Sequence, residues 1–164
     1  MIFGLSLAAF TIVHVLISLT AIAAGVVVVL GMLRAERLAG WTAVFLALTL
    51  LTSLTGFLFP IRSFTPALGT GLISTVILLA ALWALYGGHL KGGWRPVYVL
   101  GAVAALYLNV LVLIVQAFAK VPPLHGIAPT GAEPPVLVAQ AAALIVFVAV
   151  GFLAIRRFRP QARL

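Results

Sequence analysis

The chain has 164 residues, of which 65% are hydrophobic and 7% are charged, and its formal net charge is +8. Because an ordinary soluble domain carries about 25% charged residues, this composition excludes a soluble globular fold. The apolar excess needs a second solvent, which is the lipid bilayer. The chain has no cysteine, so disulfides, zinc–thiolate sites and iron–sulfur clusters are also excluded.

Five apolar segments predict an all-α integral membrane protein, with five transmembrane helices in one compact bundle that forms a single domain over residues 1–164. Each segment reaches or approaches the ~20 residues that a spanning helix needs. The first segment has no basic n-region and is too long for the apolar core of a signal peptide, so we expect it to remain as a helix. The predicted helices cover about residues 3–33, 41–59, 66–87, 96–119 and 134–155.

The basic residues predict the orientation of these helices. By alternate connections, only Arg62 and Lys120 fall on one side. The positive-inside rule makes the other side cytoplasmic, with the N terminus outside and the C terminus inside, as expected in a bacterial-type inner membrane. Trp41, Trp94 and Tyr98 are expected at the cytoplasmic interface. The basic residues of that side are Arg34, Arg37, Lys91, Arg95, Arg156, Arg157, Arg159 and Arg163.

The basic C-terminal tail predicts a contact with the membrane surface. Arg156, Arg157 and Arg159 directly follow the last apolar segment, and each charge near an anionic lipid surface contributes about 1 kcal/mol. No basic domain stands behind this tail, so we expect the bilayer, and no nucleic acid, as its partner.

Polar residues gather in the outer half of all five predicted helices, where hydrocarbon would leave them unpaired. They recur at helical spacing together with small residues, which is typical of the packed interior of a membrane bundle. We therefore expect a cavity or a satisfied hydrogen-bond cluster there. Three such faces are predicted: Thr11, His14, Ser18, Ala21 and Gly25; Thr42, Thr49, Thr52 or Ser53, and Gly56; Ala102, Ala105, Asn109, Gln116 and Lys120.

The candidate ligand-binding residues are His14, Ser18, Asn109, Gln116 and His125. His14 is the only ionisable side chain deep within a segment, which indicates either a site or a neutral histidine bonded to Ser or Asn. Asn109 and Gln116 act either as contacts between helices or as site residues. Serine and threonine hydroxyls such as that of Ser18 also bond readily to carbonyls of their own helix.

The longest outer connection, residues 121–133, is rich in proline, and we expect it to form an ordered cap over the outer end of the bundle. His125 lies either on its surface or folded toward the polar interior. Glu133 directly precedes the last helix, where a carboxylate caps the N terminus. Pairing of Glu133 with Arg62 or Lys120 is the alternative.

The chain lacks HExxH, GxSxG, Walker and dinucleotide-binding patterns and has no paired intramembrane carboxylates, which favours a role without catalysis. We expect a ligand-binding subunit associated with membrane electron transport, with an outward-facing pocket for a quinone, a haem or a small lipid-like molecule. A haem with two histidine ligands would use His14 and His125. The alternative is a structural or assembly subunit of a larger membrane complex or homo-oligomer. A small channel or carrier is the third class.

Overall fold

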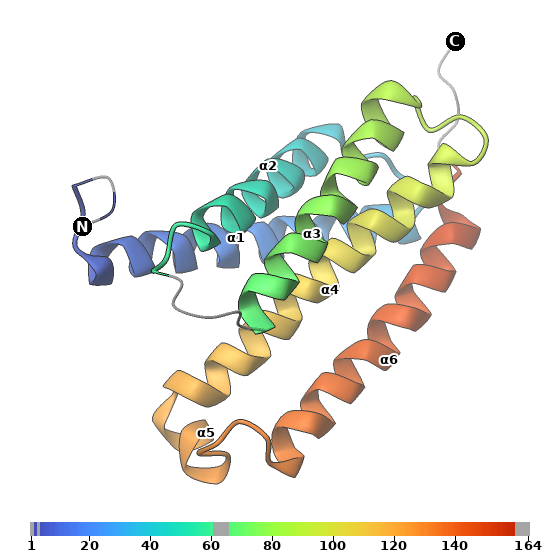
Figure 1. Ribbon diagram of the computed structural model, residues 1–164. Coiled ribbons are helices and arrows are strands. Elements are labelled where there is room, and N and C mark those ends of the chain that lie inside the picture. Colours follow the sequence, from blue (N-terminus) through green and yellow to red (C-terminus); the bar gives the residue numbers. More distant parts are fainter. Residues whose placement is uncertain (1, 3, 61–65, 160–164) are drawn as a thin grey trace.

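The computed structural model of the protein describes residues 2, 4–60 and 66–159, and these residues form an all-helical structure (Figure 1). Its elements are α1 (Leu7–Leu33), α2 (Ala39–Gly56), α3 (Pro66–Leu82), the π-helical turn η1 (Trp83–Gly87), α4 (Trp94–Lys120), α5 (Pro122–Ile127) and α6 (Pro134–Arg157). With η1 continuing α3, five helices in the described part of the chain are long and apolar enough to cross a membrane. This is the architecture of a multi-pass membrane protein.

The number of long helices agrees with the sequence prediction, whereas several helix ends differ. Helix α1 begins at Leu7 rather than at residue 3, because the Ser6 side chain accepts a hydrogen bond from the Ala9 amide and caps the helix. Helix α4 begins at Trp94, before Pro96. A proline in the first turn of a helix costs no internal hydrogen bond, so Pro96 does not mark its start.

The connection after α4, which the sequence predicts to be an ordered cap, contains the short helix α5, which was not predicted. Pro122 and Pro123 occupy its first turn, where the fixed φ of proline suits a helix. Helix α5 packs against α4, and Figure 1 shows it between the ends of α4 and α6. The connection is therefore partly helical and packs beside α4, and its role as an ordered cap over the outer end of the bundle stays a prediction.

The long helices pack as two pairs with a fifth helix on one side. Helix α1 packs mainly on α2, α3 on α4, and α6 on α4 with a smaller contact to α1. We call the end with the N terminus of α1 and the C terminus of α4 the outer end, following the predicted orientation, and the opposite end the inner end. The α1–α2 pair and the α3–α4 pair diverge toward the outer end (Figure 1).

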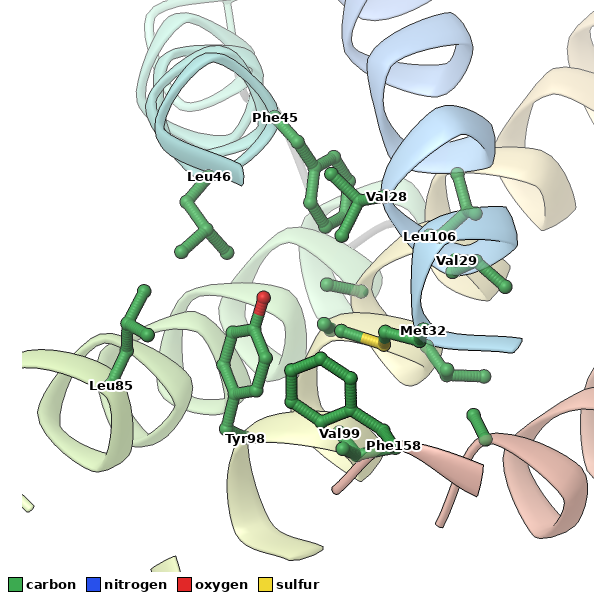
Figure 2. Packing of buried hydrophobic residues seen from close by; sticks show 14 of the residues in the cluster. Val28, Val29, Met32, Phe45, Leu46, Leu85, Tyr98, Val99, Leu106 and Phe158 are labelled. Carbon is green, nitrogen blue, oxygen red and sulfur yellow. The ribbon is translucent and has the colours of Figure 1, made fainter. Parts of the chain in front are cut away.

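The hydrophobic core lies at the inner end, where these helices converge. Figure 2 shows Met32, Phe45, Tyr98 and Phe158 packed together from α1, α2, α4 and the residue after α6. The Tyr98 hydroxyl is 3.3 Å from Oγ1 of Thr42, and both residues are buried. Tyr98 is therefore a buried core residue of the inner end, whereas Trp41 and Trp94 are exposed; the depth of these three residues in the membrane stays a prediction.

Two arginines bind backbone carbonyls at the inner end. Nη1 of Arg95 donates to the carbonyls of Ile155 at 2.7 Å and Phe158 at 2.6 Å, at the C terminus of α6. Nη1 of Arg157 is 3.5 Å from the carbonyl of Leu33 at the end of α1. A cation at a helix C terminus satisfies carbonyls that have no partner within the helix.

The other basic residues of the tail remain at the surface. The Arg156 guanidinium lies 4.1 Å from the centre of the Phe152 ring, and Arg159 is exposed. Contact of Arg156, Arg157 and Arg159 with anionic lipid stays a prediction. Arg62 and Arg163 lie outside the described residues.

Candidate functional site

A cavity of about 820 Å³ lies among α1, α2, α3 and α4 at the outer end. The two helix pairs diverge at this end (Figure 1). Its volume is within the ~300–1,000 Å³ of typical ligand sites. Apolar side chains make up most of its lining, and each of the four helices adds at least one polar side chain. A mostly apolar cavity with a few polar groups is the usual form of a small-molecule site.

The cavity brings together four of the five candidate ligand-binding residues. His14 and Ser18 line it from α1, and Asn109 and Gln116 from α4. His125 is exposed on α5 and is not part of the lining. Pairing of His125 with His14 on a haem stays a prediction, and the cavity as described offers only one of the two histidines.

The three predicted polar faces do point into the bundle. Toward the inner end, each face continues as buried small or hydroxyl residues, and toward the outer end it lines the cavity. The buried members are Ala21 and Gly25 on α1, Thr42, Thr49 and Ser53 on α2, and Ala102 and Ala105 on α4.

The last helix does not contribute to the cavity, although its polar Gln140 is expected in the same outer half. No described residue after Val121 lines the cavity, so Gln140 of α6 lies outside it. Helix α6 packs on the side of α4 and carries many exposed apolar residues, among them Leu137, Ile145 and Val148. The polar residues of one helix predict how deep they lie in the membrane. Which other helices they contact depends on tertiary packing.

His14 is held against the last turn of α2 rather than deep in the bundle. Its Nδ1 is 2.7 Å from Oγ1 of Thr55. The ring meets the Phe59 ring edge to face, at a centroid distance of 5.2 Å and an angle of 83°. A Cβ at Gly56 would lie 3.7 Å from Cε1 of His14, so the ring borders this glycine. The hydrogen bond and these neighbours fix the orientation of the ring.

The contacts of Thr55 determine which ring nitrogen of His14 carries the proton. Oγ1 of Thr55 is 2.7 Å from the Leu51 carbonyl and 3.2 Å from the Thr52 carbonyl, and a carbonyl can only accept. The single hydroxyl proton therefore points to the backbone, and Thr55 accepts from Nδ1–H. Within the described residues, Nε2 of neutral His14 is left with a lone pair and no partner.

Asn109 joins α4 to α2, as the interhelical interpretation predicts. Its Nδ2 donates to Oγ1 of Thr49 at 3.3 Å, and Thr49 is fully buried. Asn109 also lines the cavity, so both interpretations of this residue stay open. The Gln116 side chain is exposed and makes no hydrogen bond within the part of the chain that the structure describes. Its amide is free for a molecule in the cavity.

Most hydroxyls of the lining bond to their own helix, as expected. Thr11 donates to the Leu7 carbonyl at 2.8 Å and Ser18 to the His14 carbonyl at 2.8 Å. Two hydroxyls differ. Oγ1 of Thr52 and Oγ of Ser74 are buried and have no partner among the described residues, although both residues line the cavity. Buried polar groups without partners are rare. No sequence pattern distinguishes these two hydroxyls from the others, because their lack of a partner depends on tertiary packing.

The outer part of the cavity combines His14 with the last turns of α4. Gly25 of α1 lies against Leu106 of α4. The two helices run antiparallel (Figure 1). His14 precedes Gly25 in α1 by the same number of residues as Ala117 follows Leu106 in α4. Counted from this contact, His14 and Ala117 are therefore equally far toward the outer end. Gln116 and Lys120 flank that level, and both line the cavity. His14, Gln116 and Lys120 therefore all line the outer part of the same cavity.

One side of the cavity opens on the surface expected to face lipid. Val15, Leu19 and Leu113 line it and are 41%, 42% and 38% exposed, respectively. Val15 and Leu19 belong to α1, and Leu113 belongs to α4. The cavity lining therefore includes exposed apolar side chains of both helices.

Glu133 has a different partner from the expected ones. Its Oε1 accepts hydrogen bonds from the Thr130 amide at 2.9 Å and from the Thr130 hydroxyl at 2.8 Å. The bond from the Thr130 amide holds the pKa of Glu133 below its usual value. Glu133 is the N-cap residue of α6, as expected, but its side chain makes no hydrogen bond to the amides of that helix. Lys120 lines the cavity instead, and Arg62 lies outside the described residues.

The fold and the cavity define an α-helical, multi-pass type of membrane protein with a ligand-sized cavity at one end of its helices. Within the described residues, no group of three or more His, Cys, Asp or Glu side chains is placed to hold a metal ion. No protein-family model, curated protein or solved structure matches the chain.

Proposed function

We propose that the protein binds a quinone-class ligand in the cavity among α1–α4 and serves as a ligand-binding subunit in membrane electron transport. The observation that carries this proposal is the free Nε2 of His14 in the lining of a ligand-sized cavity. Thr52 and Ser74 add two buried hydroxyls without partners in the described part of the chain. A bound ring with oxygen substituents supplies partners for such groups.

The shape of the cavity supports a ligand with a polar ring and an apolar tail. Phe57 and Phe59 line the outer part beside His14, and aromatic side chains favour contact with a planar ring. The exposed edge formed by Val15, Leu19 and Leu113 leaves a path for an isoprenoid chain into the surrounding lipid. A quinone has both parts.

The donor set supports a quinone better than a haem. An electron-transfer haem with two axial protein ligands takes them from His, Met, Cys or Tyr side chains. Among the described residues that line the cavity, His14 is the only side chain of these types. A quinone needs hydrogen-bonding side chains instead, and His14, Gln116 and Lys120 provide them.

The proposed setting is a bacterial-type inner membrane, with the cavity toward the outside. The distribution of basic residues supports this orientation. Because the cavity holds no redox-active side chain of its own among the described residues, a quinone there would exchange electrons with a partner subunit. A larger complex or a homo-oligomer is therefore part of the proposal.

The test is a binding titration of the purified full-length protein with decylubiquinone, together with the absorbance spectrum and an organic extract of the same preparation. We expect a quinone in the extract and saturable binding. His14→Leu should lower the affinity at least about tenfold, because it removes a hydrogen bond at the ring. Leucine is more favourable than histidine within a membrane, so insertion should be unchanged.

His89→Ala is the matched control, because His89 is exposed at the inner end; it should bind like the unaltered protein. His125→Ala should do the same, since His125 lies outside the cavity lining. A haem spectrum, or equal quinone binding by His14→Leu, would contradict the proposal. Absence of any ligand, together with loss of a larger complex on removal of this chain, would favour the structural or assembly subunit.

A further inference from the structure

We infer that the cavity binds the reduced quinol in preference to the oxidised quinone, because Thr55 holds His14 as a hydrogen-bond acceptor toward the ligand. This inference rests on the proposed function and adds the redox form that the site selects. It depends on the direction of one hydrogen bond between α1 and α2.

The direction of that bond follows from the helical position of Thr55. Its hydroxyl lies 2.7 Å from the Leu51 carbonyl, four residues earlier in α2. Donation of the same proton to Nδ1 of His14 would leave two oxygen acceptors facing each other at this distance. The bond of 2.7 Å between His14 and Thr55 therefore has Nδ1–H as its donor.

The ring cannot readily exchange its two nitrogens. Its edge-to-face contact with Phe59 and its position beside Gly56 hold it against the outer turn of α2. A change of tautomer would break the bond to Thr55 or the bond from Thr55 to the backbone. The neutral imidazole thus offers Nε2 as an acceptor only.

The two redox forms of the ligand differ in what they can offer to this nitrogen. A quinol hydroxyl donates a hydrogen bond to Nε2, whereas a quinone carbonyl is itself an acceptor and leaves Nε2 unpaired. Gln116 and Lys120 of the cavity lining can donate to an oxygen of either form. The discrimination therefore comes from His14, and one hydrogen bond of this kind corresponds to about a tenfold preference.

The experiment compares decylubiquinol and decylubiquinone as ligands of the purified full-length protein, under anaerobic conditions. We expect the quinol to bind about tenfold more tightly, which for a two-electron couple raises the midpoint potential of the bound ligand by about 30 mV. Thr55→Ser keeps the hydroxyl and should keep the ratio. Thr55→Val removes the acceptor for Nδ1–H, frees the tautomer, and should bring the ratio close to one.

Thr20→Val is the matched control for Thr55→Val, because it makes the same change of side chain elsewhere in the protein. Thr20 donates to the Leu16 carbonyl at 2.8 Å on the exposed side of α1 and is not part of the cavity lining. It should bind both forms like the unaltered protein.

The outcomes separate this inference from the proposed function. Equal affinity of the unaltered protein for both forms, or a preference for the quinone, overturns the inference and leaves quinone binding intact. Failure of both forms to bind overturns the proposed function itself. A preference for quinol that persists in Thr55→Val overturns the role of Thr55. The ratio of quinol to quinone affinity is measured on the unaltered protein, so the inference is tested even if the variant does not fold.

Discussion

Gly25 lies where α1 passes α2 and α4 without room for a side chain. A Cβ at this position would come within 2.7 Å of the Phe45 ring and 2.8 Å of the Leu106 side chain. Both neighbours are buried and cannot turn away. We therefore expect Gly25→Ala to destabilise the protein by about 1–3 kcal/mol, as overpacking does.

This prediction can be checked by unfolding the purified protein in detergent with increasing SDS and following its helical circular dichroism. Gly40→Ala is the control, because a Cβ there meets nothing within 4 Å. It should leave the midpoint unchanged or raise it slightly, since alanine favours a helix over glycine. Equal midpoints for Gly25→Ala and the unaltered protein would show that α1 has room to move at this crossing.

The turn from Thr130 to Glu133 should depend on pH. Glu133 has a pKa below its ordinary value of 4.5, since its charged form accepts the Thr130 amide. The carboxylate therefore stabilises the turn fully above pH 4.5, and this contribution is lost as the pH falls through the lowered pKa. We expect the NMR shift of the Thr130 amide to titrate with a midpoint below 4.5. Glu133→Gln should abolish the titration, and a midpoint above 4.5 would contradict the bond.

At the scale of helices, Arg95 is predicted to hold the end of α6 to α4. Its guanidinium donates to two carbonyls at the C terminus of α6, and bonds from a charged donor contribute about 1.5–3 kcal/mol. Arg95→Ala should lower the stability by an amount in this range and loosen α6, as measured by hydrogen exchange of Ala154 to Phe158. Arg159→Ala removes an exposed arginine and should change the stability by less than about 0.5 kcal/mol.

The long helices and their inward faces could be predicted from sequence, because apolar length and helical spacing are local properties. The position of α6 could not be predicted from sequence. Gln140 indicates how deep this part of α6 lies in the membrane, but not which helices α6 packs against. The short helix α5 was missed because Pro122 and Pro123 also occur in irregular loops. His14, Ser18, Asn109 and Gln116 were identified as candidates, whereas Thr55 acts through a contact across 41 residues that no local pattern contains.

The packed inner end and the open outer end of the protein should lie on opposite sides of the membrane. The chain has no cysteine, so a single introduced cysteine is the only thiol that a maleimide can label, and its labelling reports the side of the membrane on which it lies. Ala132→Cys should react with a membrane-impermeant maleimide from outside the cell, and Lys91→Cys only after the membrane is permeabilised. The reverse pattern would invert the predicted orientation.

Photolabelling with an azidoquinone shows whether a quinone occupies the cavity among α1–α4. After illumination and mass spectrometry, the label should map to α1 between Leu7 and Ile22 and to the segment from Leu108 of α4 to Val121, since both segments contain residues of the cavity lining. Excess decylubiquinone should remove this label, and His14→Leu should reduce it strongly. Labelling confined to the exposed face of α6, or labelling that decylubiquinone does not displace, would contradict the claim.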